Sequence, residues 1–342
     1  MSIKRNISID LVKVVAMMCV MILHIPFMWR ADDNLLAFTM SRSAGMAIPL
    51  FFMVSGFLLF GRKPDFRYSI KKIIGIIKFV VIISLTWTIG VCILKQQVNW
   101  HDILSAFYGP FIQEGILGVF WYLGAMCLIY AALPIINRYI NNYPPPSVSD
   151  KNRITIRLLS IITILIVINS VIFQMNILYN FEKSVIQTFR IWNWFLYFLL
   201  GALVKELRLT NISITPIIRT LVIVLAIVGY ILFQKLSVSA HIGIEYFFGS
   251  PAHIAFSFIM FVAIASVNIS SNRVIEWLST LFLPVYAFHQ FVIYFFTKYS
   301  LIGIDSAGVA SPLVNFMIVT SVTITISAVV MKIPYVNKIF RI

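Results

Sequence analysis

The sequence predicts an all-α integral membrane protein with about ten transmembrane helices. Of its 342 residues, 60% are hydrophobic and 11% are charged, and the mean hydropathy is +0.94. Soluble domains carry about 25% charged residues, so this composition requires the lipid bilayer as its solvent. A spanning helix needs about 20 apolar residues, and ten such helices with short connections fill the chain. We therefore expect one helical membrane domain over residues 1–342, with its core at 8–331.

Apolar runs separated by polar or Pro/Gly-rich breaks give the predicted spans in order. They are 8–28, 38–60, 70–94, 116–137, 155–173, 189–206, 217–234, 252–269, 278–298 and 313–331. The second span contains Arg42 and Pro49, and the sixth is short. Three consecutive prolines at 144–146 forbid a helix and mark the clearest linker. The first run is interrupted by Lys13 and has no small-residue cleavage site, so we expect a retained first helix.

The formal charge of +15 falls on one side of the predicted topology. With the N-terminus in the cytoplasm, the inner segments hold 20 of the 27 Lys and Arg residues and 5 of the 12 Asp and Glu residues. This distribution fits the positive-inside rule with both termini cytoplasmic. Attraction to anionic lipid explains most of these charges, so no nucleic-acid partner is expected. Cys19, Cys92 and Cys127 lie in apolar runs without ligand spacing, and no metal site is expected.

The first predicted helix carries ionisable residues at membrane depth. Lys13 and His24 are eleven positions apart, which places them within roughly 20° of each other on one helix face. Asp10 lies three residues before Lys13 and is in reach of an ion pair with it. Charges inside a membrane are costly, which makes these residues functional candidates. The alternative is that Lys13 extends its ammonium group to the interface while His24 only hydrogen-bonds a neighbour.

Other candidate residues lie in a loop and in two later helices. Five basic residues, Arg62, Lys63, Arg67, Lys71 and Lys72, follow the second span and would hold either phosphates or lipid head groups. Trp121 and Tyr122 lie at the start of a predicted helix near the outer interface. They are candidates for the site, and the alternative is that they belong to an aromatic belt at the membrane surface. His289 lies in mid-span, where an interhelical hydrogen bond is the alternative to catalysis. The sequence contains no HExxH, P-loop, GxSxG or dinucleotide motif.

The segment Ile9-Asp10-Leu11-Val12-Lys13 with His24 resembles the first helix of the acyltransferase-3 family, whose signature is Arg or Lys, ten residues, then His. Further similarities follow in family order from residue 8 to about 330. They are Phe51 to Leu59 with the pair Ser55-Gly56, the basic stretch Arg62 to Lys72, Trp121-Tyr122-Leu123 with Tyr130 and Pro134, Tyr197 to Gly201, and Ser279 with Tyr286 and His289. The sequence departs from the family in having Lys13 where many members have Arg, which gives up bidentate hydrogen bonding.

The resemblance implies a membrane O-acyltransferase of the bacterial inner membrane. Such enzymes usually transfer an acetyl group from cytoplasmic acetyl-CoA to a hydroxyl of a glycan or lipid-linked sugar. We expect no hydrolase domain of the SGNH type after the helices. Members of the family without one tend to act on O-antigen, so we expect an acceptor such as lipopolysaccharide O-antigen or its lipid-linked precursor. The expected partners are the lipid bilayer, acetyl-CoA and this glycan, and the sequence leaves homo-oligomerisation open.

Roles for individual residues follow from this resemblance and from the charges. His24 would be the catalytic residue, either as general base on a sugar hydroxyl or as an acetyl-histidine. Asp10 and Lys13, with the five basic loop residues, would bind the acyl-CoA. The expected acceptor and pore residues are Arg42, Ser55, Trp121, Tyr122, Glu182, Arg190, Trp192 and His289, with Trp194 beside them. One alternative function is a transporter or flippase of a lipid-linked sugar, which would typically have paired broken helices in its two halves. The other is a structural or sensory membrane protein, which would need neither the shared face of Lys13 and His24 nor the basic loop.

Overall fold

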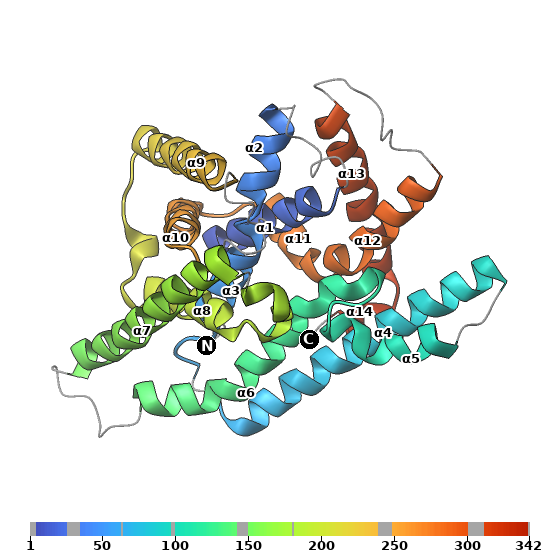
Figure 1. The fold of residues 1–342 in the computed structure, drawn as a ribbon, viewed down its shortest axis with the longest axis horizontal. Helices are drawn as coiled ribbons and strands as arrows, with labels where there is room; N and C mark the ends of the chain where they lie inside the picture. Colours follow the sequence, from blue (N-terminus) through green and yellow to red (C-terminus); the bar gives the residue numbers. More distant parts are fainter. Residues whose placement is uncertain are drawn as a thin grey trace.

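The computed structural model describes residues 5–25, 35–62, 64–96, 100–141, 150–179, 181–238, 248–299 and 311–340 (Figure 1). The helices are α1 (Ile7–His24), α2 (Leu35–Ala44), α3 (Ala47–Leu59), α4 (Phe66–Lys95), α5 (Trp100–Tyr108), α6 (Trp121–Asn141), α7 (Asp150–Tyr179), α8 (Ile191–Glu206), α9 (Pro216–Val238), α10 (Pro251–Ala265), α11 (Arg273–Thr280), α12 (Phe282–Lys298), α13 (Ser311–Lys332) and α14 (Val336–Ile339). Short 3-10 helices lie at Gly109–Phe111, Ile116–Phe120, Phe181–Ser184, Gln187–Phe189 and Leu209–Asn211. The described residues contain no strand, as the predicted all-α class requires.

Seven helical segments of the described chain are long and apolar enough to cross a membrane. They are α1, the α2–α3 pair, α4, the segment Leu117–Ile140, α7, α9 and α13. The α11–α12 pair, bent by 63°, adds an eighth if it forms one span, while α8 and α10 have 16 and 15 residues. Every predicted span therefore coincides with at least one helix, and the protein is a multi-pass membrane protein. The number of ten spans and the orientation of the termini stay predictions.

Two predicted spans are interrupted in the structure, and each interruption lies shortly before a proline. The predicted helix 38–60 is split at Gly45 and Met46, and the helix predicted to start at 278 starts instead at Phe282. Pro49 and Pro284 each occupy the third position of the second helix. A proline ring clashes with the carbonyl four residues earlier, while its missing N–H costs nothing in a first turn. The helix is therefore interrupted just before each proline, and between α11 and α12 the chain bends by 63°.

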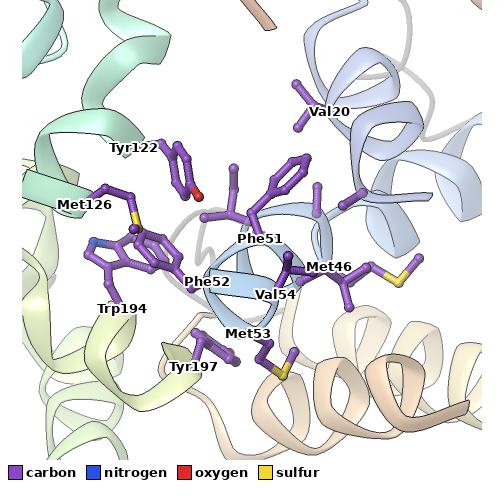
Figure 2. Close-up of a cluster of buried hydrophobic side chains, with 14 of the residues drawn as sticks. Val20, Met46, Phe51, Phe52, Met53, Val54, Tyr122, Met126, Trp194 and Tyr197 are labelled. Carbon is purple, nitrogen blue, oxygen red and sulfur yellow. The ribbon is translucent and has the colours of Figure 1, made fainter. Parts of the chain in front are cut away.

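Helix α3 forms the centre of the molecule and packs against α8 (Figure 1). Its side chains Phe51, Phe52, Met53 and Val54 point in different directions and are all buried (Figure 2). Phe52 stacks on Trp194 of α8, with ring centroids 5.1 Å apart. A helix that is buried all round is one that other helices surround. By contrast, α7 and α9 lie at the periphery (Figure 1) and expose aliphatic side chains that suit contact with lipid.

The α3–α8 contact is a backbone contact made possible by two glycines. A methyl group placed on Gly56 of α3 would lie 1.8 Å from the carbonyl oxygen of Phe198. A methyl group on Gly201 of α8 would lie 1.9 Å from the carbonyl oxygen of Met53. Small residues allow helix backbones to approach closely within membranes. The two glycines belong to separate sequence motifs, and the structure shows that they serve one interface.

Candidate active site

Two histidines from distant parts of the chain meet inside the bundle. The rings of His24, at the end of α1, and His289, in α12, have their centroids 5.0 Å apart. His289 is fully buried, and its Nδ1 lies 2.7 Å from the carbonyl oxygen of Tyr286. A carbonyl only accepts hydrogen bonds, so Nδ1 carries the proton and Nε2 keeps a lone pair in the neutral ring. This pair provides the site with two imidazoles, the side chains best suited to proton transfer near neutral pH.

An aromatic row leads from the histidine pair to α3 and α6. The Tyr286 ring stacks on the His289 ring with the two centroids 5.8 Å apart. The Tyr286 hydroxyl donates a hydrogen bond to the carbonyl of Val119. Tyr122 of α6 lies 6.1 Å from Tyr286, and its side chain hydrogen-bonds Ser55 of α3. The structure therefore brings His24, Ser55, Tyr122 and His289, four of the sequence-predicted residues, into one continuous group.

A cavity of about 940 Å³ lies where α1 begins and where α3 and α8 end. This volume lies near the upper end of the range of about 300–1,000 Å³ for pockets that hold drug-sized molecules, so the cavity accommodates a large ligand. We call it the basic cavity, because its lining includes Arg5, Lys13, Arg62, Lys205 and Arg208. Asp10 and Glu206 are the acidic residues of the same lining. The excess of cations suits a ligand with several negative charges.

Asp10 organises the α1 side of the basic cavity. Its carboxylate, whose side chain is 5% exposed, accepts hydrogen bonds from Arg5 Nε and from Lys13 Nζ, the latter at 3.1 Å. The predicted Asp10–Lys13 ion pair is thereby confirmed. Arg5 also donates through Nη2 to the Ser279 hydroxyl at 2.6 Å and to the Glu276 carbonyl at 2.7 Å. The network fixes the start of α1 against α11 and holds Lys13 at the cavity wall.

Comparison with known proteins identifies the family of this chain. The acyltransferase-3 family model, described as an acyltransferase domain, matches residues 6–332. The chain belongs to the acyltransferase-3 family. No curated protein and no solved structure matches it. The protein is therefore an acyltransferase. The histidine pair and the lining of the basic cavity, apart from Arg5, lie within the matched residues of this acyltransferase-3 domain.

The basic loop of the acyltransferase contributes less to the cavity than the sequence indicated. Of the five basic residues predicted there, Arg62 lines the basic cavity, whereas Arg67, Lys71 and Lys72 lie along the first turns of α4, Arg67 and Lys71 exposed and Lys72 half-buried. The Lys72 ammonium group lies 5.7 Å from the centroid of the Tyr68 ring. Lys63 falls outside the described residues.

Lys205 and Arg208 also line the basic cavity, although they were not among the residues predicted for the site. Lys205 Nζ donates a hydrogen bond of 2.5 Å to the carbonyl of Phe60 and so ties the end of α8 to the end of α3. One signal was present in the sequence. Both residues belong to the inner set of basic residues and follow shortly after the Tyr197 to Gly201 motif. Their placement beside Arg62 depends on the close α3–α8 contact.

The residues predicted for the acceptor end of the acyltransferase divide into separate groups. Trp121 and Trp194 pack against each other in the interior with ring centroids 4.9 Å apart, and both are buried. Arg42 lies on α2, where its guanidinium carbon is 5.1 Å from the Phe38 ring centroid. None of these three lines the basic cavity.

Glu182, Arg190 and Trp192 come together in the connection between α7 and α8. The fully buried Glu182 carboxylate accepts hydrogen bonds from Trp192 Nε1 at 3.0 Å and from the amide groups of Asn176 and Asn193 at 2.7 and 3.0 Å. Arg190 Nη2 donates to the Glu182 carbonyl oxygen at 2.6 Å. Buried polar groups need such partners, and here the partners are one another. This polar cluster holds the segment between α7 and α8 together and orients the start of α8.

Proposed function

We propose that the protein transfers an acetyl group from acetyl-CoA to a hydroxyl of a bacterial cell-surface glycan, such as lipopolysaccharide O-antigen or its lipid-linked precursor. One observation carries the proposal: α1 joins the basic cavity to the histidine pair. Lys13 lines the cavity, and His24 follows eleven residues later on the same face, a rise of about 16 Å. A donor whose phosphates bind beside Lys13 would extend its pantetheine arm along α1, which brings the thioester to His24.

The charges at the basic cavity support a nucleotide donor. Lys13, Arg62 and Arg208 offer charge-assisted hydrogen bonds to phosphate oxygens, which are about twice as strong as neutral ones. A second cavity of about 640 Å³ adjoins the first, because Asn6 lines both. It is lined by Arg219, whose Nη2 donates to the Ser266 carbonyl at 3.0 Å while its buried Nε has no hydrogen-bond partner. We assign the nucleotide end of acetyl-CoA to these two adjoining cavities, on the proposed cytoplasmic side.

The reaction would proceed by general base catalysis at His24. The imidazole takes the proton of the sugar hydroxyl while the hydroxyl oxygen attacks the carbonyl carbon of the thioester. The carbon–sulfur bond breaks, and the departing thiolate takes the proton back from His24, which leaves an acetylated sugar and free CoA. His289, whose Nδ1–H is held by the Tyr286 carbonyl, would position the His24 ring. In the variant mechanism the His24 nitrogen first accepts the acetyl group and then passes it to the hydroxyl.

The test is acetyl transfer by purified protein in lipid nanodiscs, supplied with radiolabelled acetyl-CoA and either lipopolysaccharide or its lipid-linked precursor. Because general acid–base catalysis contributes about 10²- to 10⁴-fold, His24→Ala should lose transfer by at least about 100-fold while keeping its thermal stability. Met18→Ala, six residues earlier and turned about 120° away on α1, is the matched control and should transfer normally. Unchanged transfer by His24→Ala would remove His24 from the chemistry. Acetyl-CoA left intact by the wild type with every acceptor would overturn the proposal.

A further inference from the structure

A third cavity, of about 270 Å³, lies between α4, α5, α12 and the turn that precedes α6. We call it the carboxylate pocket, after Asp102 and Glu114 in its lining. Trp87 lines it from the second half of α4, some 21 residues or about 32 Å beyond the start of that helix beside Arg62. Tyr294 lines it from α12, about 18 Å beyond the start of that helix next to the basic cavity. The two sites therefore lie toward opposite ends of the bundle.

The lining of the carboxylate pocket combines three kinds of groups. The Trp87 ring forms a wall that is held in place by Phe291 at 4.1 Å and Tyr294 at 5.4 Å between ring centroids. Asp102 and Glu114 lie at the exposed rim, where ionised carboxylates accept hydrogen bonds only. Ser84 lines the pocket from a position that is 2% exposed, and its hydroxyl has no hydrogen-bond partner. A buried polar group without a partner calls for a ligand or water to satisfy it.

We propose that the carboxylate pocket binds one pyranose ring of the glycan acceptor, an inference that rests on the proposed function. A pyranose presents apolar C–H groups to an aromatic wall and hydroxyl donors to carboxylates. Its other hydroxyls match Ser84 and Thr88, which is also in the lining. The volume suits a single ring, since it is below the range of drug-sized ligands. The two carboxylates repel phosphate and carboxylate groups, so the pocket selects an uncharged sugar unit.

The ring in this pocket belongs to the same glycan as the sugar that reacts. Tyr294 follows His289 by five residues, which corresponds to a rise of about 7.5 Å and a rotation of about 140° around α12. The pocket therefore lies beyond the histidine pair and around the helix from it. A sugar bound there would leave a later unit of the same chain free to extend around α12 toward His24. The pocket is thus an accessory subsite that positions an oligosaccharide and selects among glycans.

Sugar binding is measured by saturation-transfer difference NMR on protein in nanodiscs, because maltoside detergents would themselves supply sugar. The probes are the methyl glycosides of glucose, galactose, mannose and rhamnose, each at millimolar concentration, with empty nanodiscs as background. At least one probe should receive saturation at its ring protons from the wild type. The double variant Asp102→Asn with Glu114→Gln, and separately Trp87→Leu, should reduce this signal at least fivefold. Trp100→Ala is the matched control, since Trp100 is exposed at the start of α5 and does not line the pocket.

The outcomes separate this inference from the proposed function, since no acetyl-CoA is present in the binding measurement. Sugar signals that are absent from the wild type, or equal in the wild type and the double variant, would overturn the subsite even if acetyl transfer were intact. Displacement of the sugar signal by millimolar phosphoethanolamine would also overturn it, because the pocket would then prefer the ammonium group of a lipid head group. Thermal unfolding of each variant shows that a lost signal is not lost folding. Retained sugar binding in His24→Ala supports the subsite whether or not that variant transfers acetyl groups.

Discussion

Replacement of Gly201 by alanine tests the close contact between α3 and α8 directly. The added methyl group would lie 1.9, 2.5 and 2.6 Å from the carbonyl oxygen, carbonyl carbon and Cα of Met53, all of which are backbone atoms. Ordinary contact begins at 3.4 Å, so the two helices must separate by about 1.5 Å to admit it. Backbone atoms of a helix cannot rotate away as a side chain would.

The cost of this separation is large because α3 is buried on all sides. Moving α8 away from α3 loosens the stacked Phe52 and Trp194 rings and opens voids that no other group fills. Overpacking of a well-packed core costs about 1–3 kcal/mol and occasionally more. We expect Gly201→Ala to lower the free energy of unfolding by about 3 kcal/mol, at the upper end of this range. This loss corresponds to a fall in melting temperature of roughly 5–10 °C. Gly56→Ala should lower the stability by a similar amount. The double variant should lose less stability than the sum of the two single variants, because both substitutions push the same two helices apart.

The melting temperature can be read with a thiol-reactive fluorophore, since Cys19, Cys92 and Cys127 are free and Cys19 is buried on α1. Gly229→Ala in α9 is the matched control, because no other atom lies within 4 Å of the new methyl group. Alanine favours a helix over glycine by about 0.5–1 kcal/mol, so this control should melt at the wild-type temperature or slightly above. If Gly201→Ala melted together with Gly229→Ala, the backbone contact would not be the constraint that the structure indicates.

Two further changes test the basic cavity and the polar cluster. Arg208→Gln should raise the KM for acetyl-CoA by about tenfold with little change in kcat, because one charge-assisted hydrogen bond to a phosphate is worth about 1.5–3 kcal/mol. Arg273 is exposed and lies outside the cavity lining, so the control variant Arg273→Gln should leave the KM unchanged. Equal KM values for these two variants would exclude Arg208 from donor binding. Glu182→Gln should lower stability by about 2 kcal/mol, because either orientation of the new amide faces an N–H donor of Asn176 or Trp192. A melting temperature equal to that of the wild type would show that the carboxylate is not needed there.

Composition and local spacing were sufficient for the class of protein and for part of the site. Apolar runs of about 20 residues predict membrane helices without knowledge of their neighbours, because each helix satisfies its own backbone hydrogen bonds in lipid. The geometry of a single helix likewise predicted that Asp10 pairs with Lys13. Breaks inside such runs were missed at Gly45 and Leu281, although each lies three or four residues before a proline.

Contacts between helices could not be predicted from the sequence. The periodicity of α1 places His24 on a face, but only the packing of α12 against α1 brings His289 to it. In the same way, Lys205 joins Arg62 at the basic cavity because α3 and α8 end side by side.

The sequence by itself thus determined an all-helical membrane acyltransferase with a histidine at the end of its first helix. Only the tertiary structure decided which charges share a cavity, which polar residues satisfy each other, and why the glycines of two separate motifs are needed together. The physical reason is that helix formation depends on hydrogen bonds between residues four apart. Helix packing depends instead on the shapes of surfaces formed by residues that are distant along the chain.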